Sequence, residues 1–194
     1  RVSSDDYEAN DLWGLEKIQA PEAWAKTTGS RQGPVIAVLD TGVELDHPDL
    51  RANLWVNAGE VAGNGVDDDN NGVIDDVHGY DAVLQTGDPS DDYGHGTHCA
   101  GTVGAVGDNG EGVVGVNWQS QLMPVKMMSK GEGTVADTVR ALAYATRMGA
   151  RITSNSYGGG YNEAERDAFE NSPLLHLCAA GNESNDNDVS PFYP

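Results

Sequence analysis

A nearly all-apolar run at residues 34–40 limits most strongly what this chain can fold into. It reads Pro-Val-Ile-Ala-Val-Leu-Asp, and only its last residue is charged. Such a run suits a strand that is buried on both faces of a parallel sheet. Further strands are predicted at 122–128, 151–156 and 174–180, and helices between the four strands at 97–106, 134–148 and 162–169. This alternation predicts an α/β fold with a mostly parallel sheet and right-handed crossovers.

Polar residues follow several of the predicted strands. Asp40 ends the first strand, Ser156-Tyr157-Gly158 ends the third, and Gly181-Asn182 follows the fourth. Ligands of open parallel sheets bind outside the carboxyl ends of the strands. These residues come from distant parts of the sequence, and we expect them to meet at one edge of the sheet.

A block around His95 adds a titratable side chain to this edge. Gly94 and Gly96 flank His95 and permit a tight turn into the buried helix predicted at 97–106. A histidine at that helix N-terminus can act as a general base near neutral pH. Two other interpretations remain open. One is a structural histidine in a glycine-rich turn, and the other is a zinc site shared with His98, although no glutamate follows His95 as in the metalloprotease motif.

The charge of the chain excludes some classes of partner. The 194 residues include 31 acidic and 11 basic side chains, which gives a net charge of −20. This excess argues against binding to nucleic acid or to an anionic membrane. No apolar run has the length of a membrane span, and no signal-peptide pattern stands at Arg1. The two cysteines, Cys99 and Cys178, lie in apolar runs and are expected to be buried free thiols.

Many of the acidic residues lie in a glycine-rich insertion at 63–92. Its oxygen-bearing side chains alternate around a glycine turn, as in an EF-hand-like calcium loop, although His78 stands where an EF-hand has its last glutamate. The alternative is a solvated acidic loop without an ion. The predicted Ca²⁺ ligands are Asp67, Asp69, Asn71, Asp76 and the carbonyl of Val73.

The residues at the sheet edge fit nucleophilic catalysis. Asp40 could orient His95, and His95 could take a proton from a hydroxyl. The amide of Asn182 could stabilise a developing oxyanion. The backbone of 156–159 could pair with an extended peptide as an added strand.

Four blocks together resemble the subtilisin-like serine proteases, or subtilases. They are Asp40-Thr41-Gly42, Gly94-His95-Gly96-Thr97-His98, Ser154-Asn155-Ser156-Tyr157-Gly158-Gly159, and Ala179-Ala180-Gly181-Asn182. The resemblance implies a doubly wound sheet, with Asp40 as the triad acid, His95 as the general base and Asn182 in the oxyanion hole. It also implies two walls of a substrate cleft, formed by Ser156, Tyr157 and Gly158 on one side and by Gly131, Glu132 and Gly133 on the other.

The resemblance is closest to calcium-rich subtilases of bacteria and apicomplexan parasites. The insertion and the segment 112–118 carry this similarity. It implies a second Ca²⁺ site formed by Asp5 in an N-terminal arm at 1–12, Asp49, and Asp108.

One part of the family pattern is missing. Subtilases place their nucleophile in a Gly-Thr-Ser-Met-Ala type block after the oxyanion asparagine, and no such block occurs in 1–194. We therefore expect residues 1–194 to be the N-terminal part of a single subtilase domain, with a sheet incomplete on its C-terminal side and no activity alone. The expected function is that of a secreted or lumenal serine endopeptidase acting on polypeptides and controlled by a propeptide inhibitor. The alternative is a catalytically dead, calcium-binding subtilase-like module.

Overall fold

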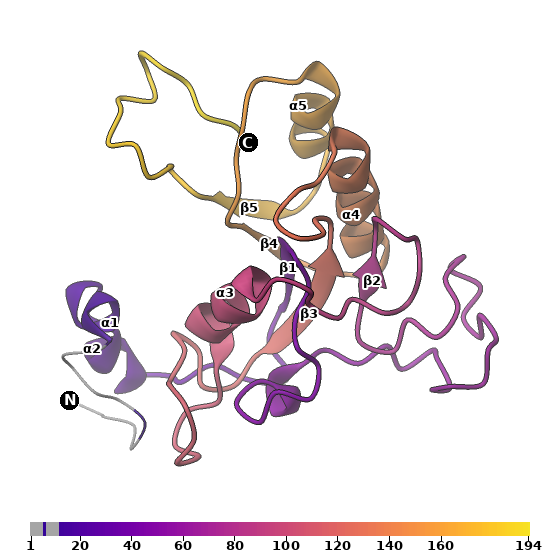
Figure 1. The fold of residues 1–194 in the computed structure, drawn as a ribbon. Helices are drawn as coiled ribbons and strands as arrows, with labels where there is room; N and C mark the ends of the chain where they lie inside the picture. Colours follow the sequence, from indigo (N-terminus) through magenta and orange to yellow (C-terminus); the bar gives the residue numbers. More distant parts are fainter. Residues whose placement is uncertain (1–5, 7–11) are drawn as a thin grey trace.

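A parallel five-stranded sheet forms the centre of the molecule, with strand order β2-β3-β1-β4-β5 (Figure 1). The computed structural model describes Asp6 and residues 12–194. The strands are β1 (Val35–Asp40), β2 (Tyr80–Asp81), β3 (Gln121–Lys126), β4 (Ile152–Asn155) and β5 (Leu175–Cys178). The helices are α1 (Trp13–Lys17), α2 (Ala20–Trp24), α3 (His95–Gly104), α4 (Val135–Arg147) and α5 (Glu163–Glu170), with a 3₁₀ turn η1 (Arg51–Asn53).

Helices cover both faces of the sheet. Leu39 of β1 lies in a hydrophobic cluster with Leu142 of α4, whereas the adjacent Val38 lies in a second cluster with Ala100 of α3. Successive side chains of a strand point to opposite faces, so α4 and α3 pack on opposite sides of β1. Figure 1 shows α4 and α5 on one side of the sheet and α3 on the other. The predicted α/β class and the doubly wound architecture are confirmed.

Side-chain caps start the helices α4 and α5. Thr134 and Asp137 form a capping box at α4, in which each side chain accepts the backbone N–H of the other residue. Asn162 accepts N–H groups of the first turn of α5.

The helix that carries His95 differs from its prediction. It runs from His95 to Gly104 and not over 97–106. It is also not buried all round, because His98 and Thr102 are exposed while Ala100 is buried. A helix that covers a sheet buries only one stripe of its surface. The run of small uncharged residues was therefore a poor indicator of complete burial.

Two further features were missed. The short strand β2 forms inside the predicted insertion and pairs with the end of β3. Cys178 is a free cysteine as predicted, but its side chain is exposed rather than buried. It lies on β5, which pairs only with β4 among the described residues and leaves Leu175 59% and Leu177 56% exposed.

Candidate active site

Asp40 and His95 form a close pair at the carboxyl end of β1. The Nδ1 atom of His95 lies 2.7 Å from Oδ1 of Asp40. The Asp40 side chain is 1% exposed, whereas that of His95 is 44% exposed. The backbone N–H of Thr41 also donates to Oδ1 of Asp40, over 2.7 Å. A buried carboxylate at Nδ1 leaves Nε2 as the ring nitrogen that can exchange a proton with a ligand.

Gly96 allows α3 to approach β1 closely enough for this contact. A Cβ atom at Gly96 would lie 2.1 Å from the carbonyl oxygen of Gly42 and 3.0 Å from Cβ of Asp40. The N–H of Gly96 donates to the Thr41 hydroxyl over 2.9 Å. Any side chain at this position would push His95 away from Asp40.

Asp91 holds the N-terminus of α3, a role that the sequence analysis missed. Its carboxylate accepts the N–H groups of Tyr93, Gly94 and Thr97, and the hydroxyl of Thr41 lies 2.8 Å away. Burial alone would raise the pKa of Asp91, but hydrogen bonds from Thr97, Gly94 and Tyr93 lower it to about 2. An anion at a helix N-terminus also interacts favourably with the helix dipole. The only sign of this role in the sequence was the presence of an aspartate a few residues before the predicted helix.

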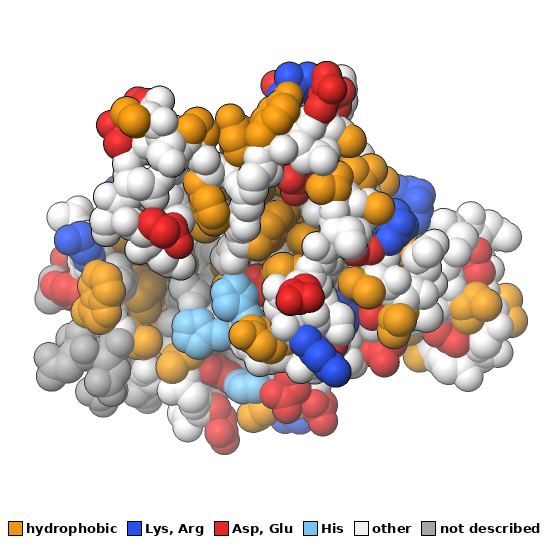
Figure 2. All heavy atoms as spheres, turned by 45° about the horizontal axis from the view of Figure 1, so that its top comes forward, with side chains coloured by type: hydrophobic (Ala, Val, Ile, Leu, Met, Phe, Trp, Pro, Cys, Tyr) orange, Lys and Arg blue, Asp and Glu red, His pale blue; other side chains and the backbone are white. Residues whose placement is uncertain are grey.

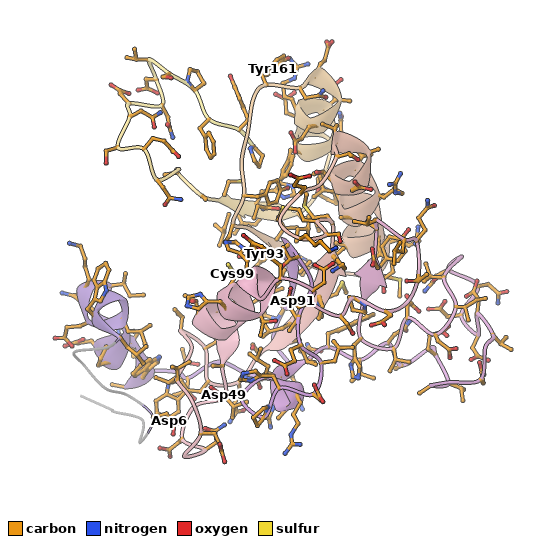
Figure 3. All side chains as sticks on the ribbon, in the orientation of Figure 1. Asp6, Asp49, Asp91, Tyr93, Cys99 and Tyr161 are labelled. Carbon is orange, nitrogen blue, oxygen red and sulfur yellow. The ribbon has the colours of Figure 1, made fainter. Side chains whose placement is uncertain are left out.

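Cys99 lies one helical turn after His95, with its sulfur 3.8 Å from Nδ1 of His95 (Figure 3). Burial raises the pKa of its thiol to about 11, against a smaller opposing effect of a hydrogen bond from Ser156. The thiol therefore stays protonated at neutral pH and is a poor nucleophile. Asp40, His95 and Cys99 have ligand atoms close enough together for a metal, whereas no such group among the described residues contains His98. The structure thus does not bring together the predicted pair of histidine zinc ligands.

The cleft wall predicted at 131–133 overlaps a tight turn at 129–132. Ser129 and Glu132 exchange backbone hydrogen bonds of 2.9 and 3.0 Å, and Gly131 has a φ of 84°. Asp92 accepts the Ser129 hydroxyl over 2.6 Å and the N–H of Lys130 over 3.0 Å. Figure 3 shows Asp91 and Tyr93 close to the start of α3. The turn is thereby tied to the segment that precedes His95.

The other predicted wall, Ser156-Tyr157-Gly158, follows β4. Ser156 and Tyr157 are partly buried and Gly158 is exposed. A Cβ atom at Gly158 would lie 2.1 Å from the ring of Phe192, so a side chain there would displace that ring. Gly159 and Tyr193 pair through hydrogen bonds of 2.7 and 3.2 Å. The contribution of Phe192 and Tyr193 to this wall was not predicted, because they lie far from it in sequence.

Asn182, the predicted oxyanion-hole residue, has fewer contacts than the two cleft walls. It is exposed in the segment after β5, and its N–H donates to Glu183 over 2.8 Å. Within the described part of the chain, no side-chain hydrogen bond joins it to Asp40 or His95. Histidine side chains are visible near the middle of the face in Figure 2.

The predicted calcium ligands of the insertion do come together. Asn71 donates its amide hydrogens to Asp69 and Asp76 over 3.0 and 2.9 Å, and its N–H lies 3.0 Å from Asp67. Burial raises the pKa of Asp69, but hydrogen bonds from Asn57 and Asn71 outweigh this effect and lower it. Val73 donates its N–H to Oδ1 of Asn71 over 2.8 Å.

Glu60 belongs to the same cluster and was missed. Its carboxylate can meet those of Asp67 and Asp69 within 4.8 Å, a spacing that would suit a metal ion. It precedes the glycine turn, and the EF-hand-like spacing gave no sign of it. Asp76 is fully buried and accepts the Tyr144 hydroxyl of α4 over 2.6 Å, which anchors the cluster to the core. An all-oxygen set with clustered carboxylates fits a hard cation such as Ca²⁺.

Of the second predicted calcium set, Asp49 and Asp108 lie within the described residues. Asp49 is 2% exposed and accepts from Asn109 over 3.0 Å and from Val113 over 2.9 Å. Asp6 accepts the N–H groups of Asn109 and Gly110 over 3.0 and 2.7 Å, so it joins the same loop (Figure 3). Asp108 is exposed, and Asp5 lies outside the described residues. The loop thus connects Asp49 with Asn109 and Asp6.

Comparison with known proteins agrees with this geometry. The model of the Subtilase family matches residues 31–193. Subtilisin-like protease 1 of Plasmodium vivax is 40% identical over 181 residues, which cover 92% of this chain and 28% of that protein. Thermitase of Thermoactinomyces vulgaris is 34% identical over 197 residues, which cover 98% of this chain and 61% of thermitase.

A solved structure shows the same fold. Fervidolysin from Fervidobacterium pennivorans, a keratinolytic enzyme related to subtilisin, matches with a TM-score of 0.69 and 28% identity over 92% of this chain and 26% of that chain. This chain therefore spans only part of the length of the relatives that it matches.

None of its described helices is long and apolar enough to cross a membrane. Because the family model extends over most of the chain, the chain belongs to the subtilase family.

Proposed function

We propose that the chain supplies the acid and the base of a subtilisin-like serine endopeptidase. The observation that carries this proposal is the 2.7 Å contact between His95 and the buried Asp40. In this role Asp40 fixes the ring orientation and tautomer of His95. Nε2 of His95 then takes the proton of a serine hydroxyl during attack on the peptide carbonyl, and returns it to the leaving amine.

Substrate binding is assigned to the two walls beside the pair. An extended polypeptide would pair with the backbone of Ser156-Tyr157-Gly158 on one side and of Gly131-Glu132-Gly133 on the other. Asn182 would donate its amide to the oxyanion that forms during attack. The support for Asn182 is its place four residues after the end of β5, whose carboxyl end lies at the same edge of the parallel sheet as that of β1.

We assign the nucleophile to a serine outside these 194 residues. Ser156 belongs to one of the predicted cleft walls, and its hydroxyl forms a hydrogen bond with the Cys99 thiol. In this proposal the chain carries half of the catalytic machinery within one catalytic domain, and residues 1–194 alone are inactive.

We also propose that the protein binds Ca²⁺. The first site would use Asp67, Asp69, Asp76 and the carbonyl of Val73, together with Glu60. Asn71 would join them after its amide turns over, because its Oδ1 now accepts from Val73. A bound Ca²⁺ would neutralise the clustered carboxylates and cross-link the insertion to the core. A second site would use Asp5, Asp49 and Asp108, and Asp6 and Asn109 lie beside it because Asn109 contacts both Asp49 and Asp6.

The complete protein would act on polypeptides and would be inhibited by a propeptide. A secreted or lumenal location is proposed because calcium sites fill most readily where calcium is abundant. Fractionation of the producing cells, with detection of the protein in each fraction, tests the location.

A fluorophosphonate probe, which reacts with activated serines, tests the catalytic proposal. In the complete protein, one serine outside residues 1–194 should be labelled, and labelling should fall sharply in His95→Ala. Labelling of Ser156 would refute the assignment of the nucleophile. A folded complete protein that binds calcium but neither reacts with the probe nor cleaves peptides would support the alternative, a catalytically dead calcium-binding module.

A further inference from the structure

Lys126 is a buried cation beside the candidate active site. It is the last residue of β3, it is 4% exposed, and it pairs in register with Asp40 of β1. Its ammonium group donates to the carbonyl oxygens of Thr41 over 2.8 Å and of Ser90 over 3.2 Å, and it lies 3.0 Å from Oδ1 of Asp92. A lysine ammonium has three N–H donors, so these partners satisfy it completely. A buried charge persists only when it is paired in this way.

The three partners belong to three different parts of the candidate site. Thr41 directly follows Asp40, and Ser90 directly precedes Asp91, which holds the N-terminus of α3. Asp92 holds the 129–132 turn, which overlaps the cleft wall predicted at 131–133. One side chain therefore connects the strand end that carries the acid, the entry to the helix that carries the base, and one wall of the cleft.

The charge of Asp92 depends on the same contacts. Burial raises the pKa of Asp92, but hydrogen bonds from Lys130, Ser129 and Lys126 lower it to about 2. Asp92 is thus an anion at neutral pH, next to the anionic Asp91. Without the ammonium group, these neighbouring carboxylates would repel each other in a chain of net charge −20. The 129–132 turn would then lose its fixed position relative to His95.

We propose that Lys126 is a positioning residue that sets the geometry of the Asp40–His95 pair and, through Asp92, of the 129–132 turn. The kinetic part of this inference rests on the proposed endopeptidase activity. Lys126 positions both the Asp40–His95 pair and the 129–132 turn, whereas Asp92 positions the turn alone. Their removal should consequently produce different kinetic patterns.

The test uses the complete protein with Lys126→Met, Asp92→Ala and the double variant. Lys26→Met is the matched control, because it removes the same charge from an exposed site near the opposite end of β3. Each variant is assayed with a short chromogenic amide that reaches only the acid–base pair, and with an extended peptide that spans both walls. Folding is checked by circular dichroism and thermal melting.

Lys126→Met should lower kcat about 10–100-fold on both substrates, since misplacement by about 1 Å can cost about 100-fold. Asp92→Ala should raise KM for the extended peptide about fivefold to tenfold, as expected for loss of one charge-assisted contact, and leave the short amide within twofold. In the double variant, KM for the extended peptide should be no higher than in Lys126→Met, because both changes break one network. A folded Lys126→Met protein with the kinetics of Lys26→Met would overturn the inference.

Amide hydrogen exchange gives a readout that needs no activity. Lys126→Met should speed exchange at the amides of Lys130, Gly96 and Thr97 at least tenfold, and Asp92→Ala should do so only at Lys130. Unchanged exchange in these variants would refute the positioning role. If the wild type cleaves neither substrate while exchange changes as expected, the proposed function fails and the positioning role stands. If Lys126→Met does not fold, Asp92→Ala, a change at an exposed residue, provides the test. Unchanged hydrogen exchange at the Lys130 amide in Asp92→Ala would refute the link between Lys126 and the 129–132 turn.

Discussion

At the scale of single residues, the contact between Asp40 and His95 is the most specific feature of the chain. The buried carboxylate fixes which nitrogen of His95 carries the proton. Asp40→Asn keeps the shape of the side chain but favours the wrong tautomer. We expect kcat of the complete protein to fall about 10⁴-fold with little change in melting temperature. Steady-state kinetics on a peptide substrate measures this, and near-normal turnover by a folded variant would end the assignment of Asp40 as the acid.

Asn182, the proposed oxyanion donor, permits a second test at this scale. A donor that acts only on the oxyanion affects turnover and not ground-state binding. Asn182→Ala should therefore lower kcat about 10²–10³-fold with KM almost unchanged. The exposed Asn171→Ala, at the end of α5, serves as the control. An effect confined to KM would show that Asn182 shapes only the pocket.

At the scale of elements, the approach of α3 to β1 depends on Gly96. In Gly96→Ala the new methyl group would collide with the backbone of Gly42, so α3 must shift and carry His95 away from Asp40. We expect loss of activity and a lower melting temperature. Gly101→Ala is the matched control on the same helix, because its added methyl group meets no atom within 4 Å. It should raise stability by up to about 1 kcal/mol through helix propensity. Equal effects of the two variants would contradict the close-approach argument.

The N-terminus of α3 also predicts a pH dependence. The pKa of Asp91 is lowered to about 2, below the value of about 3.9 for an unfolded aspartate. Its contribution to stability is therefore present above about pH 4 and is lost as the pH falls towards 2. Asp91→Asn should reduce the melting temperature at pH 7 and weaken its dependence on pH between 4 and 2. Scanning calorimetry across this range measures the effect. Exposed Asp167→Asn is the control, and an identical acid profile for Asp91→Asn would refute the role of Asp91.

At the scale of the whole molecule, the acidic insertion joins the core through Asp76 and the hydroxyl of Tyr144. Calcium at 100 times its dissociation constant would add about 2.7 kcal/mol. Each kcal/mol corresponds to about 2–4 °C for a domain of this size, so chelation should lower the melting temperature by about 5–10 °C. It should also open the 63–92 segment to proteolysis.

A pair of variants separates calcium binding from general charge effects. Asp67→Asn should abolish most of the chelator response, whereas Asp88→Asn removes the same charge from an exposed position in the same segment and should retain it. An unchanged melt in excess chelator, with no metal found by elemental analysis, would remove the calcium proposal.

The sequence by itself determined four of the five strands, the helices between them, the α/β class and the pairing of Asp40 with His95. Apolar runs, capping residues such as Thr134, and glycines around His95 act over a few neighbouring positions, so their effects can be recognised locally. Local patterns failed where burial was involved. Cys178 and the outer side of α3 lie in runs of small or apolar residues, yet both are exposed.

Only the tertiary structure decided which distant side chains meet. The contacts of Lys126 with Thr41, Ser90 and Asp92, the pairing of Gly159 with Tyr193, and the place of Glu60 beside Asp67 depend on how crossovers and loops pack. Among the described contacts, the N–H of Asn182 donates to Glu183, and its place in the oxyanion hole stays a prediction. Sequence periodicity specifies which face of an element is buried. The neighbours across that face are set by the packing of the whole chain, because no local interaction encodes them.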